Sequence, residues 1–87
     1  MQTKLLNYFI LVEPDERMGT GEPCYAAFCP VLGLSDSGNT IEEAIENMKH
    51  LITFHLESLR KEGEEIPEPH TEGGLLASVQ IPFPHAA

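Results

Sequence analysis

The side chains best suited to chemistry in this sequence are two cysteines, four histidines and many carboxylates. Cys24 and Cys29 lie five residues apart in CYAAFC, a stretch typical of a β-strand. This odd spacing places them on opposite faces of a strand, so we expect two buried, unbridged thiols in a reducing compartment. No histidine spacing is typical of a zinc site, and we expect no metal and no cofactor. The histidines are His50, His55, His70 and His85.

The carboxylates are numerous but are not placed for metal-dependent catalysis. Two-metal nucleases need several carboxylates that converge on one point. The apolar stretches LLNYFILV and CYAAFC contain none, and Glu13 only follows the first of them. Other glutamates lie outside the apolar stripe of a helix and should face solvent: Glu42, Glu43, Glu46 and Glu57. We also find no nucleophile–base pair, phosphate loop or cofactor fingerprint, so we expect no enzymatic activity.

The charge of the chain limits its partners. The 87 residues fit one domain, residues 1–87, and carry a net charge of −9. The five basic residues are scattered, so the chain should repel nucleic acid. A basic protein partner fits this charge, although an acidic surface also serves solubility alone. No apolar run is long enough to span a membrane, and the N-terminus lacks a signal-peptide pattern, so we expect a cytoplasmic protein.

Three strands are predicted in the first half of the chain. Residues 5–12 are apolar on both alternating faces, which is typical of a strand covered on both sides. Residues 13–23 form a polar loop with two glycines and two prolines, and residues 24–30 form a second strand, antiparallel to the first. A short polar strand around residues 34–37 is typical of a sheet edge.

A helix is predicted from about residue 41 to residue 62. Thr40 and Glu43 match a capping box, in which Thr40 caps the Glu43 amide and Glu43 reaches back to the Thr40 amide. Gly63 supplies the C-terminal stop, and Pro67 keeps the following chain extended. One apolar stripe runs along the helix through Ile41, Ala44, Ile45, Met48, Leu51, Ile52, Leu56 and Leu59.

A last strand is predicted at residues 75–83, where apolar and polar residues alternate and Pro82 favours an edge position. The element order is therefore β-β-β-α-β, an α+β fold with one helix on a small, mostly antiparallel sheet. If the last strand lies beside the first, that pair is parallel and its crossover is right-handed. Gly33 and Gly38 bracket the third strand, where we expect them to serve backbone geometry.

Several short motifs, taken in order, resemble the HicB-type antitoxin family. The series is Tyr25-Ala26-Ala27, Pro30 with Gly33, Ser37-Gly38-Asn39-Thr40, Glu43-Ala44, Gly63-Glu64 and Ile66-Pro67-Glu68-Pro69. Each fragment alone is unspecific, but the ordered series covers residues 6–83, nearly the whole chain.

The resemblance implies a partial RNase-H-like fold of the order β-β-β-α-β, and an oligomer that binds and inhibits a small basic ribonuclease toxin of the HicA type. Two departures stand out. Leu34 occupies a place where many members have cysteine, and the chain ends at Ala87 without room for the C-terminal DNA-binding segment of many members. We therefore expect no direct binding to operator DNA. The alternative is a stand-alone homo-oligomeric module without a toxin partner.

Candidate binding residues follow from this interpretation. We expect apolar contacts from Tyr25 and from the sheet face away from the helix, and electrostatic steering from Glu62, Glu64 and Glu65. Because both faces of residues 5–12 are apolar and one helix covers one face only, we also expect at least a dimer. The residues assigned to the structural motif are Gly33, Gly38, Thr40, Glu43, Ala44, Gly63 and Pro67.

Overall fold

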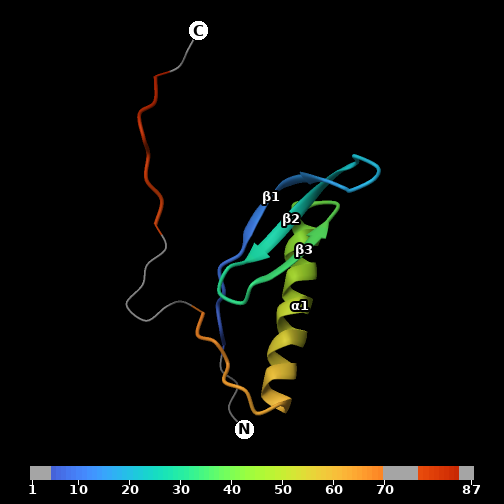
Figure 1. The fold of residues 1–87 in the computed structure, drawn as a ribbon, viewed down its shortest axis with the longest axis vertical. Coiled ribbons are helices and arrows are strands. Elements are labelled where there is room, and N and C mark those ends of the chain that lie inside the picture. The colour runs from blue at the N-terminus through green and yellow to red at the C-terminus, as the bar shows by residue number, and fades with distance from the viewer. Residues whose placement is uncertain (1–4, 70–76, 85–87) are drawn as a thin grey trace.

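The computed structural model describes residues 5–69 and 77–84, and it shows a three-stranded antiparallel sheet followed by one helix (Figure 1). The elements are β1 (Leu11–Glu16), β2 (Pro23–Cys29), β3 (Leu34–Gly38) and α1 (Ile41–Lys61). The helix crosses one face of the sheet, mainly over β3 and β2 and less over β1. The predicted α+β class is confirmed.

The sheet has the order β1-β2-β3, and both pairings are antiparallel. This confirms the predicted pairing of the first two strands and the edge position of the short third strand. Leu11 lies opposite Phe28 in the first pair, and Cys29 lies opposite Leu34 in the second. Because paired residues share a face, this register fixes which side chains meet the helix and which meet solvent.

The predicted bounds of the first strand were wrong. Residues 5–10 have no sheet pairing, and β1 starts at Leu11 and continues through Pro14 to Glu16. Pro14 does not end the strand because β1 is an edge strand, where a missing N–H is tolerated. Residues before Leu11 lack a partner because β2 ends at Cys29 and the chain turns at once.

The core is small and lies between α1 and the sheet. Its fully buried residues are Ala27, Cys29, Ala44 and Met48. Partly buried apolar side chains surround them: Tyr8, Ile10, Val12, Tyr25, Leu32, Leu34, Leu51 and Ile52. The apolar stripe predicted for the helix therefore supplies half of the buried cluster.

Both helix ends are closed by local hydrogen bonds. Thr40 Oγ1 accepts from the Glu43 amide at 3.0 Å, as predicted. The Glu43 carboxylate accepts from the amide of Asn39 at 3.1 Å, whereas the prediction gave it the Thr40 amide. At the junction with β3, the donor to the Glu43 carboxylate is thus the amide of Asn39, one residue before Thr40.

The helix ends at Lys61, one residue before its predicted end, and a Schellman motif closes it. Gly63 has a φ of +72° and donates to the Arg60 carbonyl at 3.1 Å. The Glu64 amide donates to the Leu59 carbonyl at 2.8 Å. Gly63 therefore serves as the predicted stop because it accepts the left-handed conformation that this motif needs.

Gly38 sits where β3 approaches the start of α1. A Cβ atom at Gly38 would lie 2.5 Å from the Ala44 nitrogen and 2.8 Å from the Glu43 carbonyl carbon. Nearby, the Asn47 side-chain amide donates to the Ser37 carbonyl at 2.8 Å, which ties α1 to the strand. At Gly33 the requirement for glycine is conformational. Its φ is +67° in the turn before β3, a left-handed conformation that glycine adopts readily.

The strand predicted at residues 75–83 is not formed by residues 77–83, and residues 75 and 76 lie outside the described part of the chain. Residues 77–84 are exposed and extend away from the sheet (Figure 1). The alternation of apolar and polar residues is present, but within residues 5–69 and 77–84 the sheet consists of β1, β2 and β3 and does not include residues 77–83.

Candidate partner-binding surface

The sheet face away from α1 carries an exposed apolar patch, which we call the open-face patch and define as Phe9, Leu11 and Phe28. Leu11 lies directly opposite Phe28, and Phe9 shares its side of the chain by alternation. These side chains are 55%, 54% and 43% exposed, respectively. Large apolar side chains that share one exposed face are typical of a surface that binds another protein.

Carboxylates continue the same face along β1. Glu13 and Asp15 follow Leu11 at alternate positions, and both are exposed. Ser35 and Ser37 of β3 lie on the same face, because they pair with Phe28 and Ala26 of β2, respectively. The face is therefore apolar at one end of β1 and acidic at the other, which favours a partner with apolar and cationic side chains.

Tyr25 does not belong to this face. It lies opposite Gly38, is half-buried and packs against the buried cluster on the helix side. The aromatic side chains available on the open face are Phe9 and Phe28 instead. The sequence pattern indicated this position. Alternate side chains of a strand share a face, so Tyr25 lies on the same face as Ala27 and Cys29, which are buried.

The end of the helix carries the predicted acidic residues. Glu62, Glu64 and Glu65 are all exposed and surround Gly63. The chain then passes beside residue 8, because the Tyr8 hydroxyl donates to the Pro67 carbonyl at 2.6 Å. The acidic exit of the helix therefore lies beside the segment that precedes β1.

A second surface lies on the helix side of the sheet. Residues 6–10 and α1 enclose an apolar cleft of 520 Å³, which we call the helix cleft. Its apolar walls are Leu6, Tyr8 and Ile10 on one side and Ile45, Ile52 and Leu56 on the other. The cleft exists because α1 lies mainly over β3 and β2, so the segment before β1 is only partly covered. The sequence does not indicate this cleft, because residues 5–10 have the composition of a paired strand.

Tyr8 joins the segment before β1 to the chain after the helix. Its hydroxyl donates to Pro67, and its pKa lies above the usual value of 10.0. The main cause is burial, which penalises the charged phenolate, and the negative charges of Glu68 and of an ionised Cys29 add to it. The folded state therefore holds the phenol proton more tightly than the unfolded chain does.

Replacing Tyr8 with phenylalanine should lower the free energy of unfolding by about 0.5–1.5 kcal/mol near neutral pH, because the Pro67 carbonyl loses its donor. The raised pKa stabilises the native protein below about pH 10, and this contribution is lost as the pH rises through the folded-state value. Urea unfolding at pH 8 and pH 11 measures both effects. An equally steep alkaline loss of stability in Tyr8→Phe would contradict the assignment.

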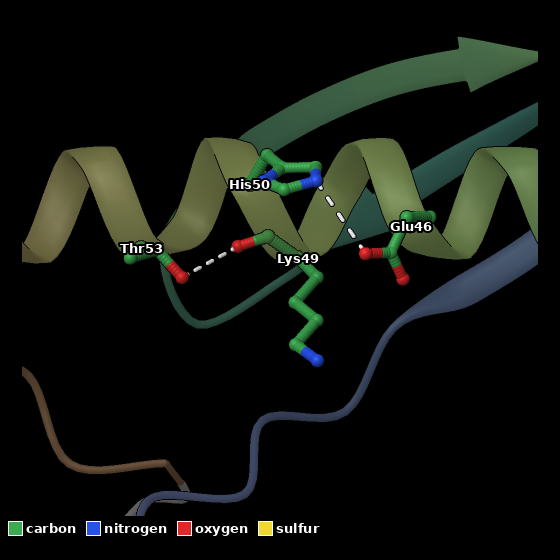
Figure 2. A network of polar contacts seen from close by, with 4 residues as sticks. All are labelled: Glu46, Lys49, His50 and Thr53. Carbon is green, nitrogen blue, oxygen red and sulfur yellow. Dashed lines mark hydrogen bonds and ion pairs between the residues drawn. The ribbon is translucent and has the colours of Figure 1, made fainter.

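Several exposed positions along α1 are polar. Figure 2 shows the Glu46 carboxylate beside the His50 ring at 3.4 Å, and the Thr53 hydroxyl donating to the Lys49 carbonyl at 2.8 Å. Lys49 also lines the helix cleft, so its charge lies at the cleft rim. Nowhere in residues 5–69 and 77–84 does a helix have the length and apolar character needed to cross a membrane.

Reactive groups are dispersed across the described chain. Cys24 and Cys29 are both buried, as predicted, and neither is bridged. Within the residues that the structure describes, no three histidine, cysteine, aspartate or glutamate side chains gather in a way that could hold a metal ion. The arrangement offers surfaces for binding, and the described carboxylates lie on separate exposed positions.

Two curated proteins are similar to this chain over most of its length. The UPF0150 protein ssr1765 of Synechocystis sp. is 38% identical over 66 residues, which cover 75% of this chain and 77% of the relative. The UPF0150 protein Ta0767 of Thermoplasma acidophilum is 32% identical over 68 residues, which cover 77% of this chain and 91% of the relative. No family model matches the chain, and no solved structure gives a significant match.

Proposed function

The chain belongs to the UPF0150 family, and on that premise we propose that it is an antitoxin-like protein that binds and inhibits a small basic ribonuclease of the HicA type. UPF0150 proteins are commonly associated with HicB-like toxin–antitoxin modules. The ordered motifs that resemble the HicB type support the same function.

The open-face patch is the observation that carries the proposal. Phe9, Leu11 and Phe28 are each about half exposed, so a partner that covers them removes apolar surface from water. Aromatic side chains near the centre of an interface contribute much of its affinity. The partner would place its own apolar side chains here, over β1 and β2.

The charge of the chain supports a cationic partner. The net charge is −9, and nine of the 14 acidic residues are glutamates between positions 42 and 72. Such a field speeds the encounter with a basic protein, and salt weakens it because the Debye length is about 8 Å at physiological ionic strength. Steering should be strongest at the acidic exit of the helix, beside the segment that precedes β1.

The alternative is a homo-oligomeric module without a toxin partner. In that case the open-face patch would be covered by a second copy, and no basic protein would bind. The two functions differ in what an added basic protein does to the chain, so a binding measurement separates them.

Reversing the three charges at the helix exit, with Glu62, Glu64 and Glu65 changed to lysine, should slow association with a small basic ribonuclease of the HicA type. We expect a roughly five- to tenfold lower association rate at low salt and little change at high salt. Stopped-flow fluorescence at several salt concentrations measures both rates.

A matched control carries the same change in net charge at the other end of the molecule, with lysine at Glu16, Glu22 and Glu42. Glu16 and Glu22 lie at the hairpin end and Glu42 lies in the first turn of α1, so this variant should slow association less. Equal effects of the two variants would contradict steering at the helix exit. Absence of any binding by the unaltered chain would contradict the proposed function.

A further inference from the structure

We propose that the outer edge of β3 is closed to strand addition by two side chains, Asp36 and Asn47, which occupy the main-chain groups of Ser37. Removing both side chains would open this edge, and β3 of one copy would then pair with β3 of another. This inference does not depend on the proposed function, because it concerns the edge of the sheet and not the open-face patch.

The register shows which main-chain groups of β3 point away from the sheet. In an antiparallel ladder, each residue directs both of its groups toward one neighbouring strand, and successive residues alternate. Pro14 has no N–H, so it occupies a position of β1 that points away from β2. Tyr25, which lies opposite Pro14, therefore bonds to β3, and Ala26 bonds to β1. The amide and carbonyl of Ser37, the β3 partner of Ala26, are thus directed outward.

Both outward groups of Ser37 are occupied by side chains. Its amide donates to Asp36 Oδ1 at 2.8 Å, and its carbonyl accepts from the side-chain amide of Asn47 at 2.8 Å. These are the groups that an added strand would use. Asp36 belongs to β3 itself and Asn47 belongs to α1, so the helix that covers the sheet also helps to close its edge.

The opposite edge of the sheet is closed in a comparable way. On β1, Pro14 offers no donor, and the next outward amide, that of Glu16, donates to Asp15 Oδ1 at 2.8 Å. Each edge strand therefore holds an outward amide with the carboxylate of the aspartate that precedes it. This recurrence indicates that the two aspartates protect the edges of the sheet.

Without Asp36 and Asn47, β3 would be suited to pair with another copy of the chain. Ser35 and Ser37 have small side chains, so a second backbone can approach the strand. Two β3 strands would pair antiparallel about a two-fold axis, in which each supplies the same groups to the other. The charge of −9 on each copy opposes this pairing, so it should be strongest at high ionic strength.

Hydrogen exchange of the Ser37 amide tests the closure in the full chain. Ser35 is the other outward residue of β3, and among the described residues no side chain bonds to its main-chain groups. Relative to its intrinsic rate, the Ser37 amide should exchange about three- to tenfold more slowly than that of Ser35, because it has one more hydrogen bond. Asp36→Ala should remove this difference, whereas Asp36→Asn keeps the acceptor oxygen and should retain it. Equal protection at Ser35 and Ser37 in the unaltered chain would overturn the closure.

Sedimentation velocity at high salt tests the consequence of opening the edge. Asp36→Ala combined with Asn47→Ala should raise the weight-average mass at least about twofold above that of the unaltered chain at the same concentration, because main-chain bonds form between copies. Far-UV circular dichroism checks that the variant keeps its helix. An unchanged mass in the folded double variant would contradict the proposal. If the double variant does not fold, the exchange measurement on Asp36→Ala decides.

Two further variants separate edge pairing from other causes of association. Asp36→Asn removes the same charge but keeps the acceptor, so its mass should equal that of the unaltered chain. Adding Ser37→Pro to the double variant removes the exposed N–H and should restore the mass of the unaltered chain. Association of Asp36→Asn, or association of the double variant that Ser37→Pro does not reverse, would place the contact elsewhere and overturn the proposal.

Discussion

Replacing Gly38 with alanine should destabilise the protein by about 3 kcal/mol or more. The new Cβ atom would lie 2.5 Å from the Ala44 nitrogen and 2.9 Å from its Cα, and these are backbone atoms that cannot rotate aside. Either β3 or the first turns of α1 must move, which separates the helix from the sheet. A domain of this size has a total stability of roughly 4–13 kcal/mol, so the loss is a large part of it.

Thermal and urea unfolding followed by circular dichroism measure this effect. A loss of 3 kcal/mol corresponds to a fall in Tm of roughly 12–24 °C for a domain of this size. Gly33 provides the matched control, because it has a φ of +67° and no atom near its missing Cβ. Asparagine tolerates that conformation, so Gly33→Asn should cost less than about 1 kcal/mol while Gly38→Asn should be as severe as Gly38→Ala. Similar costs at the two positions would contradict the close approach.

The helix could be predicted from the sequence because its signals are local. The apolar stripe, Thr40 at the N-terminus and Gly63 after the C-terminus lie within or beside the helix itself. Each acts through hydrogen bonds between residues a few positions apart, so no knowledge of the rest of the fold is needed. The donor to the Glu43 carboxylate and the last residue of the helix each differed by one residue.

The bounds of the strands depend on partners that the sequence does not display. Residues 5–10 have strand composition, but β2 ends at Cys29 and leaves them without a neighbour. Residues 77–83 have an alternation that indicates a strand, yet they do not pair with the sheet in the described part of the chain. Composition predicts which segments suit a strand, while pairing decides which of them form one.

The binding surfaces were predictable only in part. Exposure of Glu62, Glu64 and Glu65 follows from their place at a helix end. Tyr25 was assigned to a binding surface because it is aromatic. Its position two residues before Ala27 and four before Cys29 places it on the helix side of the strand. The helix cleft depends on where α1 crosses the sheet, which is a property of packing that a single sequence does not encode locally.

Substitutions in the open-face patch should abolish inhibition of the partner ribonuclease. Leu11→Asp and Phe28→Asp each place a charge where we propose that apolar side chains of the partner dock, and each should weaken binding by about 30-fold or more. Both side chains are about half exposed, so the fold should tolerate the change. Phe54→Asp is the matched control, because Phe54 is 70% exposed on α1, away from this face, and should keep full inhibition.

The most direct measurement is cleavage of RNA by a small basic ribonuclease of the HicA type from the same genome, with and without the chain added. We predict that an equimolar amount of the unaltered chain or of Phe54→Asp stops cleavage, that Leu11→Asp and Phe28→Asp do not, and that the chain alone cleaves no RNA. Cleavage that continues unchanged in an excess of the unaltered chain would contradict the account.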